Sequence, residues 1–308
     1  MARTKLYPMV QFKKDTWEID EFDIASMYLL VGTEKAMLID CGMGVGDLKG
    51  AVEMLIGNKP LIVVITHGHL DHTANAIQFP EIWMHPADQD QPIPQSYERR
   101  RGDVEKIAVR QKGCIGAPYT MFHLYPYDID EDLLEYGPEV PRPVIHDLYD
   151  CQQFDLGGGR IVTAIACPGH SKGQMAFLDS QTRSLFSGDA VNFNLGINAC
   201  PVETSLKSLK RLKALESEYD GIYNGHHDFR ALGAPLDPEA LDTAIAMCEE
   251  IVTTGKWIPT TSPSFWGQSV PLSRTPKPSS PGRPFRVCTR RGRNWLFFDP
   301  KKIREEEV

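Results

Sequence analysis

The sequence has no pair of cysteines in CxxC spacing, although its 308 residues include seven cysteines. Their number is odd and they lie far apart, so the sequence predicts neither a disulfide framework nor a structural zinc knuckle. Free thiols are typical of a reducing compartment. The chain also lacks a run of about 18 apolar residues, which a membrane-spanning helix needs, and its first residues lack the apolar stretch of a signal peptide. These absences predict a soluble, cytoplasmic protein with no membrane contact.

Positive charge is scarce as well, because 33 Lys and Arg residues oppose 41 Asp and Glu residues and the formal net charge is -8. A chain with a net negative charge is not expected to bind nucleic acid. The exception is the basic stretch at residues 271–304, where ten Lys and Arg residues accompany one acidic residue, Asp299. Such a cluster can attract phosphate, but it also flanks a Pro-rich segment and a predicted hairpin that can simply wrap the domain. We therefore expect no nucleic-acid partner.

Apolar residues make up 42% of the chain, enough for a sizeable core. Residues 26–40 contain two apolar runs separated by a polar turn, which predicts a β-hairpin, and residues 47–57 predict a helix. The run LIVVIT at 61–66 is rich in β-branched residues, as in a strand covered on both faces. Residues 81–85 predict a further strand. This order of strands and helices indicates a layered α/β architecture.

The second half of the chain returns to strands and then to helices. We predict strands at 151–155, 160–166, 174–179 and 184–187, and helices at 204–218 and 238–254. Residues 86–145 hold no clear buried strand and are rich in Pro and Tyr, which is typical of an insert that caps a site. Residues 259–308 contain a Pro- and Ser-rich segment and then a hairpin of 285–289 with 294–299. The sequence thus predicts one domain, residues 1–308, with an insert at about 86–145 and an extension at about 259–308.

The strongest chemical signal is the run Thr66-His67-Gly68-His69-Leu70-Asp71-His72, at the end of a predicted buried strand. Alternate residues of an extended segment point the same way, so His67 and His69 can converge. Asp71 and His72 can project from the start of a following helix toward a nearby point. Because imidazole and carboxylate groups suit zinc and other divalent first-row metals, the run predicts a metal site.

Further histidine and aspartate residues follow other apolar runs. His170 follows a Pro-Gly turn, Asp189 follows Ser187-Gly188, and His226 and His227 follow Asn224-Gly225. These points are predicted strand ends, where α/β folds place their chemistry. Together with the first motif, they supply enough nitrogen and oxygen ligands for two divalent ions. Asp40, which ends a strand at a glycine turn, has two open interpretations: support for a metal-binding histidine or a turn-forming carboxylate.

The motifs THGHLDH, PGH, SGD and GH, in this order, resemble those of the metallo-β-lactamase-fold hydrolases, over about residues 25–230. The resemblance implies an α/β fold, an αβ/βα four-layer sandwich of two facing mixed β-sheets with outer helices. By position, it implies a first metal held by His67, His69 and His170, a second held by Asp71, His72 and His226, and Asp189 bridging the two. It also implies a metal-bridging hydroxide as nucleophile, with Asp71 as the catalytic residue that orients the water or passes a proton. Zinc is the expected ion, and manganese, iron and cobalt accept the same ligands.

Substrate contacts are predicted at five residues: Tyr119, Phe122, Asn192, Phe193 and His227. The aromatic residues of the insert can line an apolar pocket, and packing of the insert onto the domain is the alternative. Some acyl-homoserine lactonases of this fold have a tyrosine three residues after the bridging aspartate, where this chain has Asn192. An asparagine there can still donate a hydrogen bond to a developing oxyanion.

The complete motif set predicts an enzyme, a binuclear metal-dependent hydrolase of a small-molecule carbonyl substrate such as a lactone, ester or thioester. The alternative is a phosphodiesterase or nuclease of the same fold, which the basic stretch favours. A β-lactamase is less expected because such enzymes are normally exported, and a non-catalytic metal-binding module is less expected because every ligand position is filled. The oligomeric state stays open, with a homodimer as one option.

Overall fold

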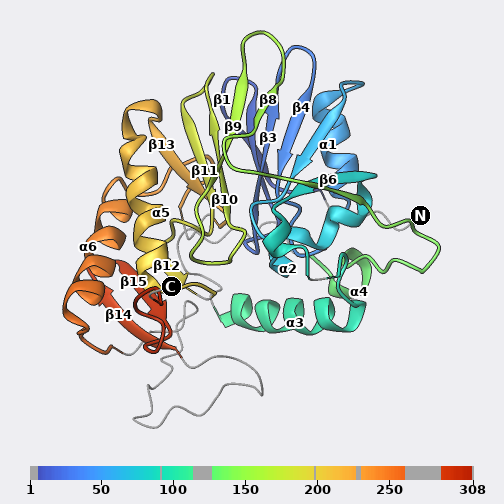
Figure 1. Ribbon diagram of the computed structural model, residues 1–308. Helices are drawn as coiled ribbons and strands as arrows, with labels where there is room; N and C mark the ends of the chain where they lie inside the picture. Colours follow the sequence, from blue (N-terminus) through green and yellow to red (C-terminus); the bar gives the residue numbers. More distant parts are fainter. Residues whose placement is uncertain are drawn as a thin grey trace.

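The computed structural model describes residues 6–90, 92–113, 127–197, 199–226, 230–260 and 286–306. Two large β-sheets face each other, and helices lie against their outer faces (Figure 1). A small third sheet contacts the helix α6 (Glu239–Thr254). This architecture confirms the predicted αβ/βα sandwich.

The first sheet contains seven strands in chain order. They are β1 (Met9–Lys13), β2 (Thr16–Asp20), β3 (Ser26–Val31), β4 (Ala36–Ile39), β5 (Leu61–Val64), β6 (Glu81–Met84) and β7 (Val144–Asp147). The pairs from β1 to β4 are antiparallel, whereas β4, β5, β6 and β7 are parallel. The helix α1 (Leu48–Ile56) connects β4 to β5, and α2 (Leu70–Thr73) with the 3₁₀ helix η1 (Ala74–Gln78) connects β5 to β6. The loops that follow β5 and β6 therefore emerge at the same edge of the sheet.

The second sheet has the order β13-β11-β10-β9-β8. Its strands are β8 (Gln153–Asp155), β9 (Ile161–Ala166), β10 (Met175–Asp179), β11 (Ser184–Gly188) and β13 (Gly221–Asn224). Only β11 and β13 pair in parallel within this described sheet, and the helix α5 (Val202–Ala214) with the 3₁₀ helix η3 (Glu216–Glu218) precedes β13. The predicted helices at 47–57, 204–218 and 238–254 correspond to α1, α5 with η3, and α6.

Alternation along the strands divides the core into three apolar layers. In β4, Met37 faces the second sheet, whereas Leu38 packs in the cluster that contains the buried face of α1. In β10, Phe177 faces the first sheet and Ala176 packs with α5 and α6. Because successive strand residues point to opposite faces, each of these strands contributes side chains both to the central layer and to an outer layer.

The helix α3 (Tyr97–Gly113) lies in the insert and was not predicted. Its sequence is so rich in charge that it lacks an apolar period. Arg100 anchors it, because the buried guanidinium donates to the Leu134 carbonyl at 2.7 Å and lies between the Tyr97 and Tyr136 rings. The insert also contains the 3₁₀ helix η2 (Pro86–Asp88) and the helix α4 (Ile129–Asp132). The predicted pocket residues Tyr119 and Phe122 lie outside the described residues.

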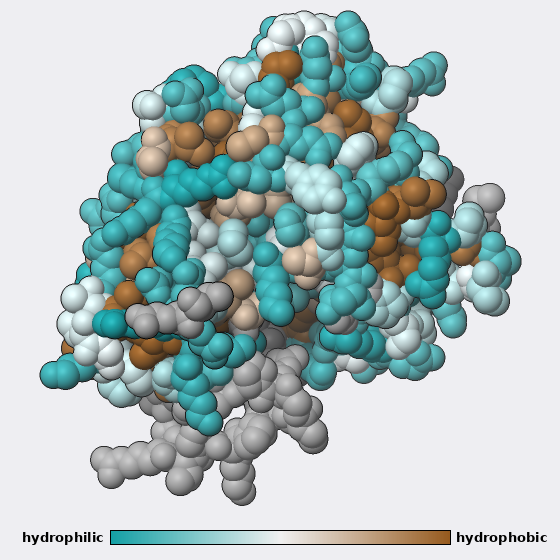
Figure 2. Space-filling view, in the orientation of Figure 1, coloured by the Kyte–Doolittle hydropathy of each residue, from teal (hydrophilic) through white to brown (hydrophobic). Residues whose placement is uncertain are grey.

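The C-terminal hairpin was predicted and is present as β14 (Val287–Arg291) and β15 (Asn294–Phe298). The additional strand β12 (Asn194–Ile197) pairs in parallel with β15. Among the described helices, none is long and apolar enough to cross a membrane. The face of the molecule in Figure 2 is largely hydrophilic, with apolar residues in separate patches.

Candidate metal centre

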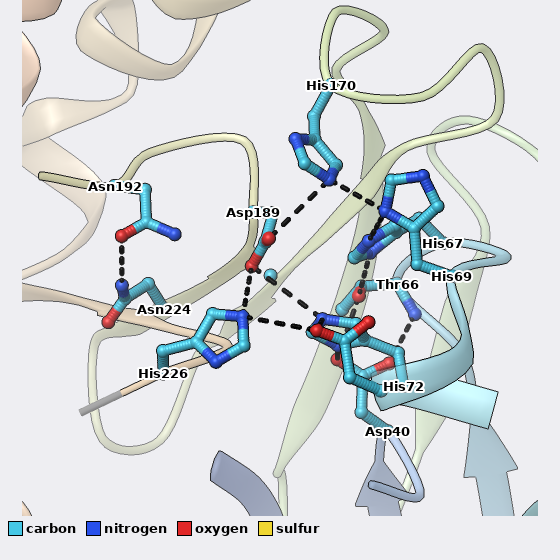
Figure 3. A network of polar contacts seen from close by, with 12 residues as sticks. Asp40, Thr66, His67, His69, His72, His170, Asp189, Asn192, Asn224 and His226 are labelled. Atoms are coloured by element: carbon cyan, nitrogen blue, oxygen red, sulfur yellow. Dashed lines mark hydrogen bonds and ion pairs between the residues drawn. The ribbon is translucent and has the colours of Figure 1, made fainter. Parts of the chain in front are cut away.

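Seven of the histidine and aspartate residues that the sequence singles out converge where several strands end (Figure 3). His67 and His69 lie between β5 and α2, and Asp71 and His72 lie on α2. The remaining three residues come from the second sheet: His170 after β9, Asp189 directly after β11 and His226 after β13. The first sheet thus supplies one side of the centre and the second sheet supplies the other.

Three imidazoles form the first group of potential ligands. His69 Nδ1 lies 3.0 Å from His67 Nε2 and 2.9 Å from His170 Nε2. His67 is fully buried and His170 nearly so. Three ring nitrogens at such short separations can converge on one ion.

Asp71, His72 and His226 form the second group. Asp71 Oδ2 lies 3.7 Å from His226 Nε2 and 3.9 Å from His72 Nε2. Asp189 reaches both groups, because its Oδ2 is 3.5 Å from His170 Nε2 and its Oδ1 is 3.5 Å from His226 Nε2. One carboxylate therefore lies within reach of both groups of potential ligands.

Hydrogen bonds on the outer side fix the tautomers of the histidines. Three Nδ1 atoms face oxygens that can only accept: His72 faces Asp40 Oδ2 at 2.8 Å, His170 faces the Gly196 carbonyl at 2.7 Å and His226 faces the Ile24 carbonyl at 2.9 Å. Each Nδ1 therefore donates, and in a neutral ring the Nε2 lone pair is free to bind a cation. This is the usual way in which a protein orients metal-binding histidines.

Asp40 joins this network at three points. It accepts the Thr66 N–H at 2.7 Å, the Thr66 hydroxyl at 2.8 Å and the His72 Nδ1–H. Since the Thr66 hydroxyl donates to Asp40, it accepts from His67 Nδ1 at 3.1 Å. Of the two interpretations of Asp40, the structure favours support for the histidines.

The protonation preferences of the centre suit a cation. Burial lowers the pKa of His67 well below its ordinary value and the pKa of His170 to about 4, so both rings are neutral at pH 7. Burial opposes ionisation of Asp189, but the neighbouring His226, His170 and His72 hold its pKa well below the usual range. Burial also lowers the pKa of His72, yet the nearby carboxylates outweigh it and raise that pKa to about 9. The same negative potential at His72 would stabilise a bound divalent cation.

Two buried atoms in the centre, His72 Nε2 and Asp189 Oδ1, form no hydrogen bond with any residue that the structure describes, although charged neighbours approach both of them. Buried polar atoms are rarely left in this state. They lie 3.8 Å apart and both face the point where the two groups meet. A set of imidazole and carboxylate ligands with unsatisfied inner atoms fits divalent ions such as zinc.

A chain of side chains leads from Arg230 to the edge of the centre. The Arg230 guanidinium donates to Asn224 Oδ1 at 2.7 Å, and Asn224 Nδ2 donates to Asn192 Oδ1 at 3.0 Å. Because a guanidinium can only donate, it fixes the orientation of both amides. The amide nitrogen of Asn192 consequently lies on the side of Asp189 (Figure 3).

Of the other predicted substrate residues, the structure describes Phe193 alone. Phe193 is half-buried against the apolar cluster between the second sheet and its helices. His227 lies outside the described residues, as do Tyr119 and Phe122. Sequence reasoning missed Arg230 and also Asp88, a buried carboxylate that contacts two of the ligand-bearing loops. Neither residue belongs to a local motif that could have revealed it.

The family model for the metallo-beta-lactamase superfamily matches residues 20–226. The chain belongs to this superfamily. Among solved structures, a metallo-beta-lactamase from Pontibacter korlensis has a TM-score of 0.52 at 14% identity, covering 78% of this chain and 97% of that one. The metallo-beta-lactamase DIM-1 has a TM-score of 0.50 at 13% identity, covering 79% and 97%. Likenesses at such identities concern the fold alone.

Curated relatives are similar over about half of the chain. The acyl-coenzyme A thioesterase MBLAC2 of Bos taurus is 26% identical over 183 residues, which are 54% of this chain and 58% of the relative. The lactamase-like protein ptaB of Pestalotiopsis fici is 24% identical over 196 residues, which are 62% of this chain and 47% of the relative. The match thus spans only about half of each relative's length.

Proposed function

We propose that the protein is a metal-dependent hydrolase that acts on a small-molecule carbonyl substrate, with an acyl thioester as the first candidate. The observation that carries the proposal is the position of Asp189, whose two oxygens reach the two separate groups of ligands. In this proposal, His67, His69 and His170 hold one divalent ion, Asp71, His72 and His226 hold another, and Asp189 contacts both. Zinc is the expected ion.

Two such ions would lower the pKa of a shared water and so supply a nucleophile at neutral pH. Asp71 is suited to orient the attacking water and to take its proton, because 30% of its side chain is exposed, against 10% for Asp189. Asn192 is suited to bind the substrate oxygen, since its amide nitrogen is directed by Arg230 and Asn224 toward the centre. A donor held in place before the reaction stabilises charge that develops on that oxygen.

The choice of a thioester is supported by the MBLAC2 relatives, which are named acyl-coenzyme A thioesterases. Lactones and simple esters offer the same carbonyl chemistry. The phosphodiesterase alternative shares the same motifs and draws further support from the basic stretch, but several described residues of that stretch have partners within the chain. Arg291 pairs with Glu250 at 2.6 Å, Arg304 donates to the Val252 carbonyl, and Arg290 stacks on Trp295. These contacts do not favour a phosphate-binding role.

The test is a hydrolysis panel on zinc-loaded protein with a lactone, an aryl ester, an acyl-coenzyme A thioester, a β-lactam and a phosphodiester. We expect turnover of a carbonyl substrate, reduced by about 10²-fold or more in Asp71→Asn. Asp155→Asn is the matched control, because Asp155 accepts a backbone N–H in a turn of the second sheet. Turnover of the phosphodiester alone, or failure to bind zinc, would contradict the proposal.

A further inference from the structure

Asp88 is a buried carboxylate between the two loops that carry the first group of histidines. It lies at the end of η2, just after β6, and is 7% exposed. Its Oδ2 accepts the Gly68 N–H at 3.1 Å and the Ser171 hydroxyl at 2.5 Å, and its Oδ1 accepts the Gly173 N–H at 2.8 Å. Within the described parts of the chain, no ion pair is formed by Asp88, so these three hydrogen bonds hold its side chain in place.

The three donors belong to the two ligand-bearing loops. Gly68 lies between His67 and His69, and Ser171 directly follows His170. The loops are about a hundred positions apart in the chain, as the separation between His69 and His170 shows. Asp88 thus joins a loop of the first sheet to a loop of the second sheet at the point where their histidines meet.

Two glycines allow the main chain of the loops to approach Asp88 closely. A Cβ atom on Gly68 would lie 2.5 Å from the Asp88 carbonyl oxygen, and a Cβ atom on Gly173 would lie 2.9 Å from Asp88 Cγ. Both separations are too short for a side chain, so the two glycines are required for the close approach. The glycine between the two histidines therefore has a role that the metal-binding motif alone does not explain.

We propose that Asp88 is a positioning residue that sets the separation between His170 and the His67–His69 pair. The inference rests on the proposed metal ligands and adds a determinant of ion affinity outside the ligand set. Without the carboxylate, the loops keep one neighbouring backbone bond, from the Met175 N–H to the Thr66 carbonyl at 2.8 Å. That bond lies at the base of the loops, whereas Asp88 holds their tips.

The substitution Asp88→Asn keeps the size of the side chain but changes its hydrogen bonding, so it tests the positioning role separately from packing. An amide has one accepting oxygen, so its NH2 group must face the N–H of Gly68 or of Gly173. At least one bond is lost and two donors then oppose each other. Substitutions of groups that orient metal-binding residues typically weaken metal binding 10- to 100-fold.

The experiment measures zinc affinity by competition with a chromogenic chelator in a His226→Ala background, which removes a ligand of the second group. We expect Asp88→Asn to bind zinc about 10- to 100-fold more weakly and to change the absorption spectrum of bound Co²⁺. Ser171→Ala, which removes one of the three donors, should cause a smaller loss, and Ser171→Thr should restore the affinity. Asp155→Asn is the matched control and should bind as the background does.

Zinc affinity and a Co²⁺ spectrum unchanged in Asp88→Asn would overturn the inference, even if the melting temperature of the metal-free protein falls. If Asp88→Asn does not fold, unchanged affinity in Ser171→Ala would overturn it equally. The proposed function fails in a different way, through results on the unsubstituted chain. If that chain binds no zinc, the inference falls with the proposed function; if it binds zinc but turns over the phosphodiester alone, the proposed function fails and the inference is still decided by the Asp88→Asn affinity.

Discussion

The substitution Asp40→Asn tests how far the centre depends on one carboxylate that is not itself a proposed ligand. Asp40 has a φ of +65°, a left-handed conformation that asparagine adopts readily. The substitution therefore conserves shape and backbone and removes only the charge and one acceptor. Any effect on metal binding must then arise from the lost charge or from the hydrogen bonds to Thr66 and His72.

The magnitude follows from the number of donors that Asp40 accepts. Oδ2 accepts from the Thr66 hydroxyl and from His72 Nδ1, and Oδ1 accepts from the Thr66 N–H. If the amide nitrogen of an asparagine occupies the Oδ2 position, His72 loses its acceptor and its proton can move to Nε2, the proposed ligand atom. If it occupies the Oδ1 position, it opposes the Thr66 N–H. A hydrogen bond to a charged group contributes about 1.5–3 kcal/mol, which corresponds to a loss of about 10- to 150-fold in zinc affinity.

The assay is a zinc titration by chelator competition, with the melting temperature of the metal-free protein measured in parallel. Asp47→Asn is the matched control, because Asp47 caps α1 by accepting the Gly50 N–H and asparagine caps a helix equally well. We expect the control to bind zinc normally and Asp40→Asn to bind it more weakly. Equal affinities in the two variants would refute the role of Asp40.

Three further predictions concern stability and packing. Arg160→Met should reduce the free energy of unfolding by about 3–5 kcal/mol in a denaturant titration, since it leaves the fully buried Asp179 without its cation; addition of Asp179→Leu should recover part of the loss. Gly225→Ala should abolish tight zinc binding, measured by metal analysis, because the new Cβ atom would lie 2.5 Å from His72 Cε1. Burial raises the pKa of Glu21 from 4.5 to about 8, so its contribution to stability is complete below pH 4.5 and is lost as the pH rises through 8. Glu21→Gln should flatten the decline in unfolding free energy over that range, and an unchanged pH profile would contradict the shift.

The sequence predicted the parts of the fold whose signals are local. The run at 61–66 is apolar and β-branched, and it forms the strand β5, which buries Val63 and Val64 and leads into the histidine motif. The helix α3 escaped prediction because its charged sequence has no apolar period and because Arg100, its main anchor, is buried against two tyrosines. The strand β12 was not predicted because its partner β15 lies about a hundred residues later, and pairing at that distance produces no local sequence pattern.

The residues of the candidate site also differ in whether a local sequence signal predicts them. His67, His69, Asp71 and His72 share one short motif, so the chain itself holds them close together. His170, Asp189 and His226 could be grouped with them because each follows an apolar run at a strand end. Asp88 and Arg230 act through contacts with residues far away in the chain, and only the arrangement of the strands brings them to the centre. Residues of this second kind carry no motif, since hydrogen bonds to loops impose no sequence pattern.

The placement of the centre relative to Arg160 explains why both ends of the sandwich need polar groups. Arg160 precedes β9 and bonds to the Asp15 and Val31 carbonyls of the first sheet and to Asp179 of the second. His170 follows the same strand at its other end, where the candidate metal centre joins the two sheets again. Apolar side chains hold the sheets together along their faces but do not fix how one slides against the other. Directional contacts at the two ends of β9 fix that position, and this allows histidines from separate sheets to meet within about 3 Å, the separation at which His69 and His170 lie.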